Sequence, residues 1–482
     1  MAIGLGVLAL AGVASSLIAL QAADSRSDEI HQLTDDLEAV RNEREELATK
    51  VERAASDSSV IESRWLAAVA ISGNYSPAQS RLLAVEAATR SPTPESLAAV
   101  GSLLFADPRT KPPIVELEHD GPVLVTATAA SSQVVATGSD DTTTKLWSTD
   151  GDLLATLAHS GKVTAVDFSA DDRLVATGSR DGTAAAWTVA GETVASAAHT
   201  DQVNDVAISG DGALMVSGGH DGAAIVTNAE TGETRHQLRH TDIVWTVALS
   251  DGGEVAATGG QDGQIRMWDL ETGDEIAVYD IGQPVTALGF SPDGLWLFAG
   301  GQGGEAVLID VNDGEAGQPL DGTFVGGVLD IDWHPEGTEM AVVSLGRINR
   351  YDLPTMALIA EHRVAGGARG VAYGPDGSWF VTGSGDFEFN FGAITFWETS
   401  TGTELVALNL GGPVESISVH PTGNVLAGFR TTEDLVEVGG ARLVPGPNDW
   451  IALACAGTDG IISEQIWSEL SGESASNETE CL

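Results

Sequence analysis

The sequence contains very little cysteine. Only two cysteines occur among 482 residues, Cys455 and Cys481, and both stand near the C-terminus. This scarcity excludes a disulfide framework and any cysteine-rich metal site. The two thiols could form a single disulfide if the tail lies outside the cell, or they could stay free in a reducing compartment.

Positive charge is also scarce. The chain has 23 Lys and Arg residues against 70 Asp and Glu residues, which gives a formal net charge of -47. Such a chain repels a phosphate backbone, so nucleic acid is not an expected partner. No long run of like charge occurs, and the acidity is typical of a solvated surface that keeps a protein soluble.

Motifs of the common catalytic and cofactor-binding sites are absent from the sequence. The one Gly-Lys pair, Gly161-Lys162, lacks the other residues of a phosphate-binding loop, and no G-x-S-x-G nucleophile motif occurs. His236 and His240 stand four residues apart, but on a predicted strand that spacing does not bring two imidazoles to one metal ion. The Asp-Gly pairs indicate turns, since no calcium-binding loop surrounds them. We therefore expect no catalytic residue, no cofactor and no metal ion.

The N-terminal segment is uncharged and mostly apolar from residue 2 to residue 20. At a helical rise of about 1.5 Å per residue, such a segment nearly spans a hydrocarbon core of roughly 30 Å. Residues 1–22 are therefore predicted to be a transmembrane anchor. A cleaved signal peptide is the alternative, although a positively charged leading region and a good cleavage site are missing. The flanking charges do not decide on which side of the membrane the chain continues.

Residues 23–62 are predicted to form a helical stalk, and residues 63–112 a collar of short helices. The apolar residues at heptad spacing are Ile30, Leu33, Leu37, Val40, Leu47 and Val51. This pattern could pair two chains in a homodimer, or it could lay a single helix against another element of the same chain. In the collar, Ser76 and Thr93 are predicted N-caps before Pro77 and Pro94, because proline is favoured at the first helical position.

The rest of the chain is dominated by a repeat of 40 or 41 residues that begins at residue 119. The recurring residues are His119, His159, His199 and His240, followed by Asp141, Asp181, Asp221 and Asp262. Alternating runs such as VTAVDFS and turn sequences such as ATGSRDGT stand at the same places in successive repeats. This arrangement predicts short strands and tight turns at regular spacing.

These units resemble WD repeats, in which each repeat of about 40 to 45 residues forms one four-stranded propeller blade. The dipeptide itself stands at Trp268-Asp269. The resemblance implies a hydrogen-bonded tetrad of His, Ser or Thr, Asp and Trp, which would satisfy a buried imidazole and carboxylate. Complete sets are His119, Ser139, Asp141 and Trp147 in the first repeat, and His159, Ser179, Asp181 and Trp187 in the second.

Later repeats keep only part of the tetrad. The third and fourth retain His199 and Asp221, and His240, Asp262 and Trp268. In the third repeat, Gly219 and Thr227 stand where the hydroxyl and the indole are expected. In the fourth repeat, Gly260 stands where the hydroxyl is expected. The fifth has Gly303 where the aspartate is expected and the sixth has no tetrad, so both are expected to depend on apolar packing. The seventh recovers Ser384, Asp386 and Trp397, with an insertion, FEFNFG, between its second and third strands.

An eighth repeat is indicated by PVESISVHPTGNVLAGF. PIVELEH at 113–119 supplies a lone outer strand that could pair with this last repeat and close the ring without an open sheet edge. We predict an all-β propeller of eight blades over residues 113–444, with seven blades as the alternative. Residues 445–482 are then a C-terminal tail with short helices.

The resemblance also implies where a partner binds. Propellers of this family usually bind proteins or peptides over the face that borders the central channel, near the start of each innermost strand. The equivalent residues are Leu124, Thr164, Asn204, Trp245, Thr286, Leu329, Arg369 and Glu415. Trp245 and Arg369 are residue types that often dominate binding energy, whereas ordinary packing within the blade is the alternative for each position.

The leading functional hypothesis is a membrane-anchored, non-catalytic scaffold or sensor module that binds a protein or peptide. The order of anchor, stalk, helices, propeller and tail resembles the C-terminal half of bacterial multidomain signalling proteins that carry WD repeats. The alternatives are a propeller enzyme with its site in the central channel and a structural component of the cell envelope.

Overall fold

The computed structural model describes residues 60, 63–64, 66–68, 70–72, 77–106, 114–312, 318–322, 324–353, 355–364, 366–386, 391–433, 436–447 and 449–450. The predicted anchor, nearly all of the predicted stalk, and Cys455 and Cys481 lie outside the described residues. Among the helices of the described part, none is both long and apolar enough to cross a membrane.

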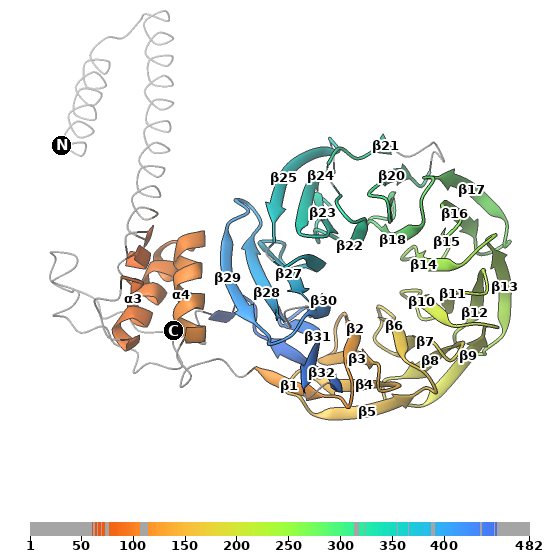
Figure 1. The fold of residues 1–482 in the computed structure, drawn as a ribbon, viewed down its shortest axis with the longest axis horizontal. Coiled ribbons are helices and arrows are strands. Elements are labelled where there is room, and N and C mark those ends of the chain that lie inside the picture. Colours follow the sequence, from red (N-terminus) through yellow and green to blue (C-terminus); the bar gives the residue numbers. More distant parts are fainter. Residues whose placement is uncertain are drawn as a thin grey trace, which may run out of the picture. The chain divides into compact units, whose positions relative to one another are not determined.

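The strands form eight antiparallel sheets of four strands each. In seven sheets, four strands that follow one another in the sequence pair in that order. The sheets succeed one another around a central axis, and their innermost strands lie side by side (Figure 1). The predicted all-β propeller with eight blades is confirmed, and the alternative of seven blades is wrong.

Each blade contributes one strand to each of four concentric positions. The innermost strands are β2 (Val123–Thr128), β6 (Val163–Phe168), β10 (Val203–Ile208), β14 (Val244–Leu249), β18 (Val285–Phe290), β22 (Val328–Trp333), β26 (Ala368–Tyr373) and β30 (Val414–Val419). The second strands are β3 (Val134–Ser139), β7 (Leu174–Ser179), β11 (Leu214–Gly219), β15 (Val255–Gly260), β19 (Trp296–Gly301), β23 (Glu339–Ser344), β27 (Trp379–Asp386) and β31 (Val425–Glu433). Blades are numbered 1 to 8 in this order.

The two outer positions complete the blades. The third strands are β4 (Thr143–Ser148), β8 (Thr183–Thr188), β12 (Ala223–Asn228), β16 (Gln264–Asp269), β20 (Ala306–Asp310), β24 (Arg347–Asp352), β28 (Phe391–Glu398) and β32 (Val436–Val444). The outermost strands are β5 (Leu153–Ala158), β9 (Thr193–Ala198), β13 (Thr234–Arg239), β17 (Glu275–Asp280), β21 (Gln318–Pro319), β25 (Ala357–Arg363), β29 (Glu404–Asn409) and, for blade 8, β1 (Val115–Glu118).

Blade 8 is assembled from both ends of the propeller sequence. β1 pairs antiparallel with β32, and Val115 lies opposite Leu443. The lone outer strand predicted within residues 113–119 therefore closes the ring as expected. Because the first strand completes the last sheet, the ring has no open end at which another strand could add.

The blades pack against one another through a repeated contact between a glycine and a valine. The glycine belongs to a second strand and the valine begins the next innermost strand. The pairs are Gly138–Val163, Gly178–Val203, Gly218–Val244, Gly259–Val285, Gly300–Val328, Gly383–Val414 and Gly428–Val123. A Cβ atom at Gly300 would lie only 2.5 Å from Val328. Glycine is therefore required there because the neighbouring blade occupies the space of a side chain.

Blade 6 carries a buried ion pair on the side that faces blade 7. Arg350 of β24 is 4% exposed and donates hydrogen bonds of 2.7 and 2.8 Å to the two carboxylate oxygens of Glu339 of β23. The Tyr373 hydroxyl of blade 7 donates to the same carboxylate at 2.5 Å. The expectation that this repeat depends on apolar packing alone is therefore wrong, since three polar groups satisfy one another in its core.

Helices α3 (Pro77–Arg90) and α4 (Pro94–Ala106) lie directly before the propeller in the sequence. Both begin at the prolines that the sequence indicates. At the start of α4, the Ser96 amide donates to Thr93 Oγ1 at 3.2 Å, and the Thr93 amide donates to Ser96 Oγ at 2.9 Å. This reciprocal cap satisfies two amides that have no partner within the helix.

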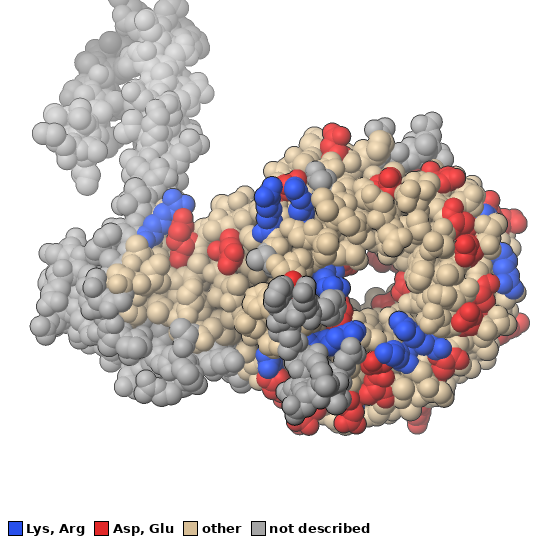
Figure 2. All heavy atoms as spheres, in the orientation of Figure 1, with Lys and Arg blue, Asp and Glu red and all other residues tan. Residues whose placement is uncertain are grey.

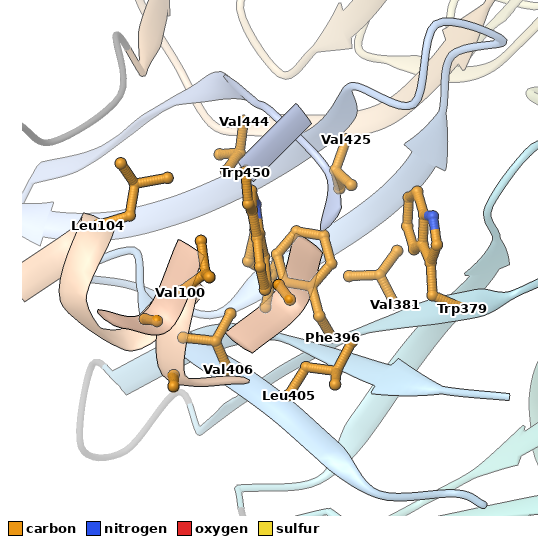
Figure 3. Packing of buried hydrophobic residues seen from close by; sticks show 14 of the residues in the cluster. Val100, Leu104, Trp379, Val381, Phe396, Leu405, Val406, Val425, Val444 and Trp450 are labelled. Carbon is orange, nitrogen blue, oxygen red and sulfur yellow. The ribbon is translucent and has the colours of Figure 1, made fainter. Parts of the chain in front are cut away.

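Helix α4 packs against the outermost strand of blade 7 (Figure 3), and α3 packs against α4. Leu405 of β29 is 4% exposed there, whereas the equivalent residues Leu154 and Ile276 on blades 1 and 4 are each 49% exposed. Trp450, which follows β32, is fully buried in the same cluster, and its ring lies edge-on to Phe105 and Phe396. The segments before and after the propeller are thus joined on one blade by burial of apolar surface.

Candidate functional site

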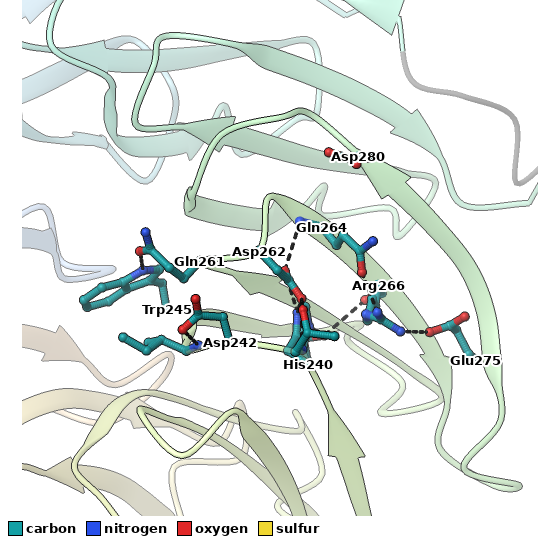
Figure 4. A network of polar contacts seen from close by, with 12 residues as sticks. His240, Asp242, Trp245, Gln261, Asp262, Gln264, Arg266, Glu275 and Asp280 are labelled. Atoms are coloured by element: carbon teal, nitrogen blue, oxygen red, sulfur yellow. Dashed lines mark hydrogen bonds and ion pairs between the residues drawn. The ribbon is translucent and has the colours of Figure 1, made fainter.

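Blades 1 and 4 contain a complete hydrogen-bonded tetrad, and blade 2 contains most of one. In blade 1, His119 Nδ1 lies 2.8 Å from Asp141 and His119 Nε2 lies 2.7 Å from the Thr137 hydroxyl. The Trp147 indole donates to the same hydroxyl at 2.8 Å. Blade 4 has the same arrangement around Thr258, and Figure 4 shows His240 beside Asp262. Blade 2 repeats the contacts of the imidazole and the indole with Thr177, but His159 Nδ1 lies 3.1 Å from Thr183 Oγ1 and 3.5 Å from the Asp181 carboxylate.

The hydroxyl of the tetrad was wrongly assigned from the sequence. Ser139 Oγ contacts the Pro122 carbonyl at 2.9 Å, and Ser179 Oγ contacts the Gly161 carbonyl at 3.0 Å. Neither serine contacts the imidazole, because the threonine two residues earlier on the same face of the strand takes that place. Two hydroxyls in one alternating run cannot be told apart by periodicity alone.

This correction changes the assessment of three later blades. Blades 3 and 4 retain the hydroxyl in Ser217 and Thr258, so Gly219 and Gly260 are not losses. Blade 3 lacks only the indole, because Thr227 stands at that position. In blade 7, the Trp397 indole donates to Thr382 at 3.0 Å, while Ser384 Oγ donates to the Ala393 carbonyl.

The tetrads are closed to any substrate. The four imidazoles have exposed side-chain fractions between 0% and 2%. Burial raises the pKa of Asp141, but hydrogen bonds from His119 and Thr143 hold that pKa well below its ordinary value. Burial lowers the pKa of His159 and His240, which the adjacent aspartates oppose only in part. A neutral imidazole that donates to a carboxylate and accepts from a hydroxyl joins the strands and has no free lone pair for catalysis.

All eight residues of the predicted partner face occupy the same structural position. Each is the second residue of an innermost strand and lies at a break in register with the second strand. The residues are Leu124, Thr164, Asn204, Trp245, Thr286, Leu329, Arg369 and Glu415. A β-bulge redirects the side chain that it leaves unpaired. We call the end of the propeller that carries these residues the bulge face.

Three of the eight side chains connect adjacent blades. Thr164 and Thr286 donate to the carbonyl groups of Val203 and Val328, at 2.9 and 2.8 Å. Asn204 donates to the Val244 carbonyl at 2.7 Å. These contacts agree with the alternative that such positions serve packing within the propeller.

Trp245 contacts the turn between the second and third strands of its own blade, and Glu415 contacts the second strand of its own blade. The Trp245 indole donates to Gln261 at 2.6 Å (Figure 4), and its ring lies edge-on to His220 with centroids 5.0 Å apart. Glu415 Oε1 lies 2.8 Å from Arg430 Nε. These side chains are partly buried and already engaged in polar contacts.

Leu329 differs from the other seven, because it is 40% exposed and lies among further exposed apolar residues. Val325, Leu345 and Phe391 are exposed by 50%, 51% and 39%, respectively. Val325 precedes β22, Leu345 lies in the β23–β24 turn and Phe391 begins β28, so all lie at the bulge face. We call these four residues the apolar patch. Its signal in the sequence is leucine at both Leu329 and Leu345, where blade 3 has Asn204 and His220.

Four carboxylates on the innermost strands were not singled out from the sequence. Asp167, Asp205, Asp330 and Asp332 each accept a hydrogen bond of 2.7 to 3.0 Å from a backbone amide of the next innermost strand. Burial raises the pKa of Asp330 to about 7 and that of the other three to about 6. They hold neighbouring blades together around the central opening seen in Figure 2. We call these four residues the channel carboxylates.

The described residues include no group of three or more His, Cys, Asp or Glu side chains arranged to hold a metal ion. A groove of about 560 Å³ lies between α4 and β29 and is lined mainly by apolar residues such as Phe105, Ile114 and Leu408. It contains no cluster of titratable groups.

Comparison with known proteins identifies the repeat. A family model described as WD domain, G-beta repeat matches residues 111–148, 151–188, 191–228, 232–269 and 275–310. The crystal structure of the computationally designed Ika8 protein is similar in fold, with a TM-score of 0.58 and 23% identity. The similarity covers 69% of this chain and 98% of that chain. No curated protein matches the sequence. Five repeats recognised by the family model, in a ring of eight four-stranded blades, identify residues 111–310 as WD repeats of a β-propeller.

Proposed function

We propose that this protein is a non-catalytic scaffold that binds a protein partner across the bulge face. The observation that carries the proposal is the exposed apolar patch on that face. Soluble proteins rarely expose several large apolar side chains together unless another molecule covers them. WD-repeat propellers generally bind protein partners, which supports the same conclusion.

The tetrads support a non-catalytic function. Their imidazoles and carboxylates recur from blade to blade, and in blades 1, 3 and 4 they are hydrogen-bonded to one another. Because catalysis requires an accessible nucleophile, base or metal, these buried sets serve folding. The channel carboxylates likewise accept hydrogen bonds from the backbone of the next blade.

We further propose that residues 1–22 anchor the protein in a membrane and that residues 23–62 hold the propeller away from it. The support is the uncharged segment at 2–20 and the heptad pattern behind it. Carbonate extraction of membranes tests the anchor, since deletion of residues 2–20 should release the chain into the supernatant. Protease treatment of intact cells would then show on which side the propeller lies.

Site-specific photocrosslinking in the native cells tests the scaffold. A benzoylphenylalanine placed at Gln261 or Leu345 should crosslink the full-length chain to discrete protein partners. The same group at Leu153, which is 52% exposed on the perimeter, is the control and should not capture them. Equal capture from Leu153, or no capture from either face position, would contradict the proposal.

A further inference from the structure

The apolar patch is continuous across blades 6 and 7. A Cβ atom at Gly326, next to Val325, would lie 3.0 Å from Leu345 Cβ, and one at Gly367 would lie 3.3 Å from Leu345 Cδ1. A Cβ atom at Gly366 would lie 3.5 Å from the Phe391 ring. Leu345 thus lies over the loops that precede both innermost strands, and Phe391 lies beside the second loop.

The glycines around the patch leave its apolar side chains standing clear of neighbours. Gly326, Gly327, Gly346, Gly366 and Gly367 all have positive φ angles, between 77° and 87°. Other residues adopt this backbone conformation with difficulty, so these five positions favour glycine and carry no side chain. The result is a surface on which Leu345 and its neighbours project between bare backbone.

The size of the patch favours a short peptide over a second propeller. At the exposed fractions above, four such side chains offer on the order of 300 Å², the lower end of a functional surface patch. A stable protein–protein interface buries about 800 Å² on each partner. A single peptide segment with one or two apolar anchors matches the smaller area.

The charge around the patch indicates the second property of the ligand. The segments 324–329, 345–346, 364–369 and 391–394 contain one basic residue, Arg369, and no Asp or Glu. One carboxylate, that of Asp386, belongs to the residue that pairs with Phe391 across β27 and β28. The whole chain nevertheless carries a formal charge of -47. A second copy would therefore be repelled, whereas a basic segment would be drawn toward the molecule and could place its apolar residue on the patch.

We propose that Val325, Leu329, Leu345 and Phe391 bind the apolar side chain of a short basic peptide segment of a partner protein. This inference rests on the proposed scaffold function, and it names the place and the chemistry of the contact. It also gives a reason for leucine at position 329, where blades 2 and 3 have Thr164 and Asn204, whose side chains donate hydrogen bonds to the next blade.

Peptide selection against the full-length purified chain tests this inference. The probe is a displayed library of random dodecapeptides, and enriched peptides are then synthesised and titrated by fluorescence anisotropy. We expect an aliphatic or aromatic residue flanked by Lys or Arg, and an association rate that falls as salt is added. Leu345→Ser and Leu329→Ser should each weaken binding at least tenfold without adding charge.

Leu358→Ser is the matched control, because Leu358 is 38% exposed but lies on the outermost strand of blade 6. Unchanged thermal unfolding of all three variants would show that the fold is intact. Peptides that bind Leu345→Ser as well as the native chain, but lose affinity with Trp245→Ala, would overturn the patch and retain the scaffold. Enrichment of no peptide over an unrelated acidic protein would overturn both.

Discussion

At the boundary between blades 6 and 7, Val343 of the second strand lies in one cluster with Ala368 of the next innermost strand, so the larger side chain belongs to the second strand. Seven boundaries pair a glycine of a second strand with a valine of the next innermost strand, whereas this one pairs a valine with an alanine. Both residues are fully buried in one cluster. The larger side chain at this boundary thus belongs to the other blade, and the pair is larger than a Gly–Val pair by one methyl group.

This relationship predicts a compensating pair of substitutions. Ala368→Val should lower stability by about 1–3 kcal/mol through overpacking, and Val343→Gly should lower it by a similar amount or more through a cavity. The double variant recreates the arrangement of the other boundaries and should recover much of the loss. Thermal unfolding of the four proteins measures the coupling, and simple additivity of the two losses would contradict it.

Thr258 and Ser139 should respond differently to removal of their hydroxyls. Thr258→Val leaves both His240 Nε2 and the Trp268 indole without a buried partner, which should cost about 1–3 kcal/mol. Ser139→Gly should cost less, because blades 3 and 4 keep their imidazole–carboxylate contact with glycine at that position. Urea unfolding midpoints compare the two, and a larger loss for Ser139→Gly would restore the original assignment.

Removing one partner of the ion pair in blade 6 should lower stability more than removing both partners. Arg350→Met leaves the Glu339 carboxylate buried beside Tyr373, and such an uncompensated charge typically costs about 3–5 kcal/mol. The double variant Arg350→Met with Glu339→Leu removes the charge as well and should be closer to the native chain. Differential scanning calorimetry at neutral pH measures both. A double variant less stable than the single one would show that the pair has no such coupling.

The channel carboxylates predict a dependence on pH. Burial raises the pKa of folded Asp330 to about 7, against about 3.9 in an unfolded chain. The folded chain therefore binds the extra proton between those values, and its stability from this group falls as the pH rises from about 4 to 7. Asp330→Asn cannot titrate but can still accept the hydrogen bond from the Val371 amide.

We expect Asp330→Asn to melt at a higher temperature than the native chain at pH 8 and to lose this advantage at pH 4. The lowered pKa values of His159 and His240 act in the opposite direction, since stability from them is lost below about pH 6.5. They are present in both proteins and cancel in the difference. A difference in melting temperature that does not change with pH would refute the assignment.

Trp450 should control the attachment of the helices to blade 7. Its ring would collide with any side chain at Gly101 and contacts Phe105 and Phe396, so Trp450→Ala should cost about 3–5 kcal/mol locally. Hydrogen exchange should accelerate at the amides of α4 and stay unchanged in β10 to β12. Equal protection of α4 in both proteins would show that the helices dock without this residue.

Much of the propeller could be predicted from local patterns, because seven of the eight blades are each formed by four consecutive strands. The recurrence of His119 and Asp141 at a constant period indicates the first four units, and Pro94 with Thr93 marks the start of a helix. These features depend on residues that are close in sequence. Closure by β1 was also predictable, since a lone strand needs a sheet to join.

The contacts that could not be predicted depend on register or on the neighbouring blade. Glu339 and Arg350 meet only because β23 and β24 pair in one register and face blade 7. Thr137 and Ser139 lie on one face of a strand, so only coordinates show which hydroxyl reaches His119. The apolar patch is formed by loops of two blades, and no single repeat contains it.

The pairing of residue 115 with residue 443 bears on synthesis. β1 leaves the ribosome long before the strands of its own sheet exist, and at about 5–20 residues per second the delay amounts to tens of seconds. During that time seven sheets can assemble while the last gap stays unsealed. A nascent chain stalled before β32 should therefore remain sensitive to proteases near its first strand, even though most of its blades are already folded.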